Sequence, residues 1–134
     1  MPAVYKMTEA IPKALDELLE VRGYKNVKYV DVLHCRLEGW TAPKMKCPEH
    51  DYEVIRMHRM DEEWLEGVNQ LIDIPYPSME KIQKKIFRRI RLPMICVKIR
   101  HQGKVVGTGL GVLERHYIGL YAIHVHRDYR RQGL

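Results

Sequence analysis

The pattern of apolar and polar positions predicts an α+β domain in which helices precede a run of strands. Apolar residues at helical spacing predict three helices, over residues 8–22, 62–71 and 79–91. Runs rich in β-branched residues predict strands over 26–37, 52–57, 94–100, 105–113 and 117–125. Because short turns join the last three strands, we expect them to form an antiparallel meander, part of an α/β mixed sheet with flanking helices.

Local signals place the ends and faces of these helices. Pro12 suits the first turn of the first helix, Asp61 can cap the second and Ser78 can cap the third. The third helix has an expected apolar face of Met79, Ile82, Ile86 and Ile90, with Phe87 beside it. Its other face is basic, and we interpret that face as solvated.

The predicted strand over 105–113 has glycine at every second position, at residues 107, 109 and 111. This alternation leaves one face of the strand without side chains. Such a strand favours a bulge, or the close approach of a ligand or another backbone.

Composition limits the class of protein. The 134 residues suit one domain, and 46% of them are hydrophobic, which excludes a disordered chain. We expect no membrane span and no signal peptide, and the three cysteines indicate reduced thiols in a cytoplasmic protein. Cys47 and His50 have the spacing of half a metal site, but too few further ligands are near, so we expect no metal.

Charge is divided unevenly along the chain. Residues 1–77 carry a net charge of −4 and residues 78–134 a net charge of +10. The second half therefore favours a polyanionic partner. A nucleic acid is disfavoured, because only Phe87 is interleaved with the cations of the basic helix.

The most informative segment is an apolar strand followed by a basic, glycine-containing loop, residues 121–134. Backbone N–H groups in such a loop can hold a phosphate, and Gly133 would allow its close approach. Arg130 and Arg131 add positive charge for phosphate oxygens. A solvated basic turn is the alternative interpretation of this loop alone.

In this context the chain resembles the GNAT superfamily of acyl-CoA-dependent N-acyltransferases. The family signature is an apolar strand, a short turn and then Gln/Arg-x-x-Gly-x-Gly/Ala opening a helix, and residues 130–134 (RRQGL) match its first five positions. Two helices followed by a three-stranded meander also fit the beginning of a GNAT module. The resemblance covers about residues 52–134.

The resemblance implies acetyl-CoA as cosubstrate and an amine as acceptor. It places the pantetheine arm on the backbone of Ile123, His124 and Val125. It places the pyrophosphate on the loop N–H groups, with Arg130 opening the motif; the loop residues are Arg131, Gln132, Gly133 and Leu134.

The base that takes the amine proton stays unassigned. The usual GNAT base is a Glu on or near this strand, and no Glu lies between Glu114 and residue 134. His124, Glu114 and Tyr121 are the candidates, and His124 has the most suitable ordinary pKa. By strand alternation, we expect His124 to point away from the face that carries Ile123 and Val125.

The match stops inside the motif, at Leu134. We expect the chain to be the N-terminal portion of a longer protein, with Gly or Ala next and then a helix, and to bind CoA poorly by itself. Residues 51–134 would be part of an acyltransferase domain. Residues 1–50 would be a helix-strand segment, either an ordinary amphipathic helix or a degenerate half-module.

An alternative function is a non-catalytic interaction module. An open strand over 117–125 would leave a sheet edge, and unpaired edges tend to find another chain. Such a module would form a homodimer through this edge.

Overall fold

The computed structural model describes residues 11–26, 31–41, 51–72 and 77–134. The chain divides into two units, Met1–Thr41 and Ala42–Leu134. The first unit contains helix α1 (Lys13–Val21), and Pro12 is its N-cap rather than part of its first turn. The strand expected over 26–37 is wrong for residues 31–37, which have no strand partner among the described residues; residues 8–10 and 27–30 lie outside them.

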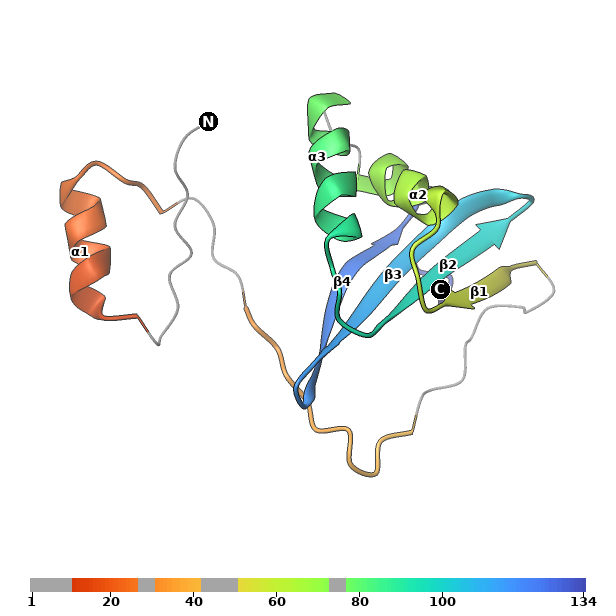
Figure 1. The fold of residues 1–134 in the computed structure, drawn as a ribbon, viewed down its shortest axis with the longest axis horizontal. Coiled ribbons are helices and arrows are strands. Elements are labelled where there is room, and N and C mark those ends of the chain that lie inside the picture. The colour runs from red at the N-terminus through yellow and green to blue at the C-terminus, as the bar shows by residue number, and fades with distance from the viewer. Residues whose placement is uncertain (1–10, 27–30, 42–50, 73–76) are drawn as a thin grey trace. The chain divides into compact units, whose positions relative to one another are not determined.

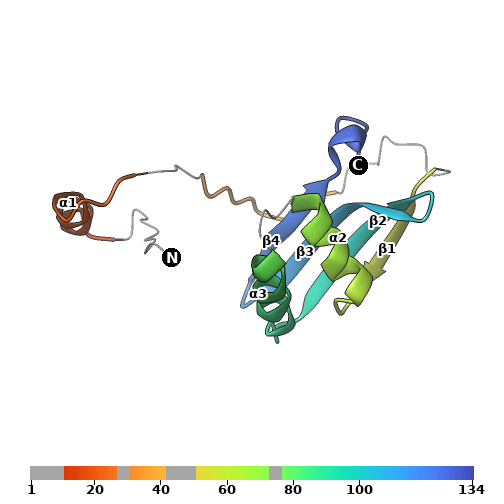
Figure 2. The same ribbon diagram turned by 90° about the horizontal axis from the view of Figure 1, so that it is seen from above.

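The second unit is the α+β domain that the sequence predicted (Figure 1). Its four strands form one antiparallel sheet in the order β1–β2–β3–β4, so the meander is confirmed. Helices α2 and α3 lie over the same face of this sheet (Figures 1 and 2). In chain order the elements are β1 (Glu53–Met57), α2 (Glu62–Ile72), α3 (Pro77–Arg88), β2 (Met94–His101), β3 (Lys104–Glu114), β4 (Tyr117–Val125) and the 3-10 turn η1 (Arg127–Tyr129).

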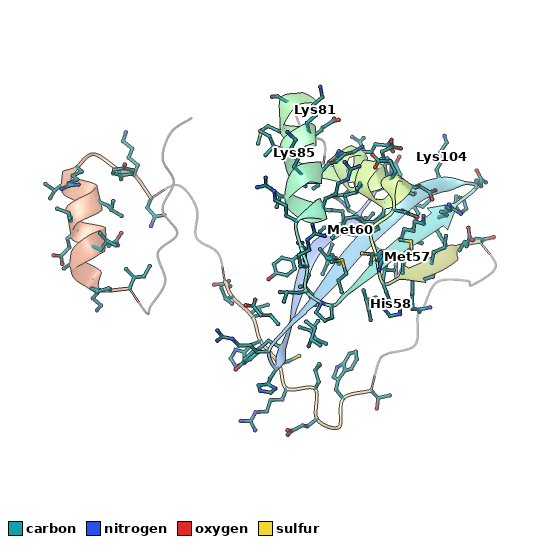
Figure 3. All side chains as sticks on the ribbon, in the orientation of Figure 1. Met57, His58, Met60, Lys81, Lys85 and Lys104 are labelled. Atoms are coloured by element: carbon teal, nitrogen blue, oxygen red, sulfur yellow. The ribbon has the colours of Figure 1, made fainter. Side chains whose placement is uncertain are left out.

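The core lies between α2 and the middle of the sheet. Trp64 is fully buried, and its indole N–H donates to the carbonyl of Val97 at 3.0 Å. Asp61 caps α2 as predicted, because its Oδ1 accepts from the backbone N–H of Trp64 at 2.8 Å. The buried residues of the core cluster are Trp64, Leu65, Val68, Cys96, Leu110 and Val112, and Met57 and Met60 pack against them (Figure 3).

An ion network fixes the first turn of α2 to β2. The Lys98 side chain is almost fully buried, and its ammonium lies 2.5 Å from both Asp61 Oδ2 and Glu63 Oε2. Arg100 also binds Glu63. The hydrogen bonds from Arg100 and then Lys98 lower the pKa of Glu63 to about 2. Asp61 and Glu63 are therefore stabilised twice: they form ion pairs with β2, and their negative charges lie at the positive end of the α2 helix dipole.

Helix α3 is rotated from the orientation that its sequence predicted. Phe87 stacks edge-on against Trp64, with ring centroids 5.3 Å apart. Ile90 of the predicted face packs against the core, but it lies beyond the end of α3 at Arg88. Met79, Ile82 and Ile86 of the predicted buried face are exposed.

Ion pairs with α2 explain the rotation of α3, and the position of Pro77 explains where the helix begins. Lys84 and Arg88 each lie 2.5 Å from Glu62 of α2, so they hold the helix at this rotation. The helix begins at Pro77, so Ser78 lies inside it and is not its cap. Lys81 and Lys85 are exposed along α3, as expected for a solvated basic face (Figure 3).

Candidate functional site

Strand β4 contains a bulge at its centre. Thr108 pairs with His124 and Leu110 pairs with Tyr121, so Ala122 and Ile123 of β4 oppose the single residue Gly109 of β3. Ala122 has a φ of 48°, which is in the left-handed region. The Thr108 hydroxyl donates to the Ala122 carbonyl at 3.1 Å. The bulge therefore falls opposite the middle of the three alternating glycines, where the sequence favoured an irregularity.

The bulge also changes which side chains of β4 share a face. Residues three apart on a regular strand point to opposite faces. Here Tyr121 and His124 pair with Leu110 and Thr108, which are two residues apart on β3. Tyr121 and His124 therefore lie on the same face, the face that carries α2.

The basic loop after β4 is held by contacts to the end of the sheet. The Arg130 Nε donates to the Val125 carbonyl at 3.0 Å, and the Tyr52 hydroxyl donates to Gln132 Oε1 at 2.8 Å. Arg131 and Gly133 have φ values of 63° and 87°. At Gly133 this conformation has no steric cost, which is the role expected of glycine in such a loop.

An aromatic cluster packs between this loop and the strands β1 and β2. The ring of Tyr129, in η1, lies with its centroid 5.3 Å from that of His101 and 5.7 Å from that of His126. Tyr52 lies 5.1 Å from His101. The cluster joins the beginning of β1, the end of β2 and the loop. Sequence reasoning missed this cluster, because Tyr52, His101 and Tyr129 are far apart along the chain.

His124 lies at the level of the bulge, between the loop and the rest of β4. Burial, and then the positive charge of Arg130, lower the pKa of His124 below its ordinary value of 6.5. The imidazole is therefore neutral at pH 7 and able to accept a proton.

The hairpin between β3 and β4 forms a cavity of about 330 Å³ that is open to solvent, since Tyr117 and Tyr121 in its lining are 75% and 54% exposed. It brings together Glu114 and Tyr121, two of the three residues that the sequence offered as a base, and His124 does not line it. A Cβ on Gly119 would lie 2.6 Å from the Tyr121 hydroxyl oxygen, so the Tyr121 ring lies across Gly119. The lining residues are Val112, Glu114, Arg115, Tyr117, Gly119 and Tyr121.

Four of these lining residues were missed from the sequence: Val112, Arg115, Tyr117 and Gly119. A signal was present, because Tyr117 and Tyr121 share a face of β4 by strand alternation, with Gly119 between them. The register then pairs Tyr117 with Glu114 across the hairpin.

The described residues contain no group of three or more His, Cys, Asp or Glu side chains able to hold a metal ion. Cys47 and His50, the pair with metal-ligand spacing, lie outside the described residues. Of the described cysteines, Cys35 is exposed and Cys96 is buried, and both are free thiols. Burial raises the pKa of Cys96 to about 11, so this thiol is protonated and unreactive. No helix in the described part of the chain could cross a bilayer.

Comparison with known proteins identifies the second unit. The model of a family described as the acetyltransferase (GNAT) family matches residues 47–134. This range holds the sheet, the bulge, the basic loop and the hairpin cavity. No curated protein matched the chain.

Proposed function

Because the chain belongs to the acetyltransferase (GNAT) family, we propose that it transfers an acetyl group from acetyl-CoA to an amine. The observation that carries the proposal is the bulge in β4 followed directly by the basic loop. The bulge interrupts the ladder at Ala122 and Ile123, and the loop then presents two arginines and a glycine. An extended, anionic molecule such as acetyl-CoA fits this order of features.

The residues that would hold acetyl-CoA follow from the family resemblance. The backbone of Ile123, His124 and Val125 would pair with the pantetheine arm. The backbone N–H groups of the loop would bind the diphosphate, with charge from Arg130 and Arg131. The loop residues in this role are Arg131, Gln132, Gly133 and Leu134.

Acetyl-CoA would supply the thioester carbonyl, and the protein would supply the base and the orientation. The acceptor arrives as an ammonium ion and must lose a proton before its nitrogen can attack the carbonyl carbon. The new C–N bond then forms as the C–S bond breaks, and the thiolate of CoA leaves and takes up a proton. A backbone N–H near the bulge would stabilise the negative charge on the carbonyl oxygen.

Glu114, Tyr121 and His124 are the candidate bases. The hairpin cavity favours Glu114, since this residue lines the same cavity as Tyr121. His124 is the alternative, because its lowered pKa leaves it neutral and ready to accept a proton.

Calorimetric titration of the chain with acetyl-CoA tests the first step of this proposal. We expect weak but saturable binding by the wild-type chain, and a further several-fold loss of affinity in Arg131→Gln. Lys81→Gln removes the same charge from the exposed face of α3, away from the loop, and should leave the affinity unchanged. No binding by the wild-type chain, or equal losses in both variants, would contradict the proposal. Release of free CoA thiol on addition of amines then tests transfer.

A second candidate function is a non-catalytic module that pairs through β4. Among the described strands β4 lies at the edge of the sheet, and it exposes Ile118, Leu120 and Ile123. Such an edge favours pairing with a second copy. Sedimentation at several concentrations would show a homodimer that Leu120→Lys dissociates. A chain that stays monomeric would exclude this alternative.

A further inference from the structure

We propose that the cavity in the β3–β4 hairpin receives the acceptor, and that this acceptor is a small zwitterion carrying one ammonium and one acidic group. The inference rests on the proposed acetyltransferase function and names the class of its substrate. The volume of about 330 Å³ lies at the lower end of the range for small-molecule sites.

Two side chains of opposite charge line this cavity next to each other. Glu114 ends β3, and Arg115 is the first residue of the turn that follows. Neither side chain forms a hydrogen bond or an ion pair with any residue that the structure describes. Their charges therefore stay available to a ligand. An ammonium group suits the Glu114 carboxylate, and a carboxylate or phosphate group suits the Arg115 guanidinium.

Both charges together select a narrower class than either charge alone. A polyamine would place a second positive charge near Arg115, which is unfavourable. A ligand with one positive and one negative charge gives both Glu114 and Arg115 a partner of opposite charge.

The walls of the cavity suit the rest of such a ligand. Tyr117 and Tyr121 lie on the same face of β4, and Gly119 between them carries no side chain. The missing Cβ leaves room for the Tyr121 ring, whose hydroxyl oxygen would lie only 2.6 Å from it. Aromatic rings attract an ammonium ion and also pack against hydrocarbon.

The position of the cavity fits the proposed reaction. Tyr121 lies directly before the bulge, and the step from Tyr121 to His124 covers only two residues of β3, roughly 7 Å. Ile123 begins the segment proposed to hold the acyl end of acetyl-CoA. The end of the cavity at Tyr121 would therefore lie nearest the thioester, and Glu114, which pairs with Tyr117 four residues further along β4, would lie at the other end.

Binding of three matched probes tests the inference without any transfer reaction. L-phenylalanine carries both charges, phenethylamine lacks the carboxylate and 3-phenylpropanoate lacks the amine. Each is titrated into the ¹⁵N-labelled chain while the amide signals of Gly119 and Tyr121 are followed. We expect L-phenylalanine to bind at least fivefold more tightly than either probe with one charge.

Two variants assign the charges. Arg115→Gly should lower the affinity for L-phenylalanine to that for phenethylamine, and it should leave the affinity for phenethylamine unchanged. The turn should survive this change, because Arg115 has a φ of 56°, a conformation that glycine adopts readily. Gln102→Gly is the matched control, since Gln102 has a φ of 50° in the other hairpin turn, and it should change nothing. Glu114→Gln should weaken L-phenylalanine to the level of 3-phenylpropanoate.

Equal binding of L-phenylalanine and phenethylamine, or shifts confined to residues outside the hairpin, would overturn the inference. The calorimetric titration with acetyl-CoA separates this failure from failure of the proposed function. If acetyl-CoA binds and the zwitterion does not, only the inference fails. If the zwitterion binds in the hairpin and acetyl-CoA does not, the cavity stands as a binding site and the proposed function fails.

Discussion

Replacing Lys98 with Met should weaken the attachment of α2 to the sheet. Met keeps the apolar stem of the side chain and removes only the charge. The Lys98 side chain is 3% exposed, and its ammonium lies 2.5 Å from the carboxylates of Asp61 and Glu63. Its loss leaves these carboxylates without the cation that neutralises them in the folded protein, although Arg100 still binds Glu63.

The expected cost lies between two known limits. Removing one partner of a buried ion pair costs about 3–5 kcal/mol, and removing a pair at the surface costs about 0–1 kcal/mol. The carboxylate side chains are 44% and 36% exposed, so they can turn to water after the substitution. We therefore expect a loss of about 2 kcal/mol at pH 7. For a domain of this size that lowers the melting temperature by roughly 8–16 °C.

The effect should depend on pH in a defined direction. In the folded protein the pKa of Glu63 is lowered to about 2, from 4.5, by Arg100 and Lys98. Burial alone would raise the pKa of Asp61, but the hydrogen bond from Lys98 helps to lower it. A carboxyl with a lowered pKa stabilises the fold above its ordinary pKa, and this contribution is lost as the pH falls through the folded value. The difference between wild type and variant should therefore shrink between pH 5 and pH 2.

Urea unfolding followed by circular dichroism at pH 7, 4 and 2.5 measures this difference. Lys104→Met is the control, because Lys104 is an exposed residue at the start of β3 (Figure 3). It should change the free energy of unfolding by less than about 0.5 kcal/mol. The reasoning is refuted if Lys98→Met costs no more than this control, or if its cost is as large at pH 2.5 as at pH 7.

Three further changes test the packing and the loop. Gly67→Ala should destabilise by about 1–3 kcal/mol, because the new methyl would lie 2.7 Å from Val105 Cγ1; urea unfolding measures it, and a neutral result contradicts the close approach. Asn69→Leu should raise the melting temperature, because both polar atoms of this buried amide lack a hydrogen-bond partner among the described residues. A lower melting temperature than that of the wild type would contradict this and indicate that the amide is hydrogen-bonded in solution. Tyr52→Phe removes the hydrogen bond to Gln132, so it should weaken the binding of acetyl-CoA, measured by calorimetry, while changing the free energy of unfolding by only about 1 kcal/mol. An unchanged affinity would show that this hydrogen bond does not support the binding loop.

The elements that the sequence predicted well are those with strong local signals. The three strands after residue 93 and both of their turns were found, because the turns are short and the apolar runs are distinct. The cap of α2 at Asp61 was found because it is a contact within one helical turn. The strand expected over 26–37 failed in its described part, since β-branched residues favour a strand only where a partner strand is available.

The candidate site was predicted less completely, because its residues meet through the sheet. The sequence offered Glu114, Tyr121 and His124 as unconnected candidates. Pairing of β3 with β4 joins Glu114 and Tyr121 in one cavity and adds Arg115 and Tyr117. The support of the loop by Tyr52 depends in the same way on the position of β1 in the sheet.

The sequence by itself determined the α+β class, the meander, the concentration of positive charge after residue 77 and the loop motif that resembles the family. All of these depend on composition or on residues close together in the chain. Only the tertiary structure decided the rotation of α3 and the faces of β4. Contacts of Phe87 with Trp64, and of Lys84 and Arg88 with Glu62, turn α3 away from its own apolar stripe.

In β4, one extra residue at the bulge shifts the alternation of side chains. Tyr121 and His124 therefore share a face, whereas in a regular strand they would point to opposite faces. Periodicity along a chain assumes an unbroken ladder, and only the partner strand determines where that ladder shifts.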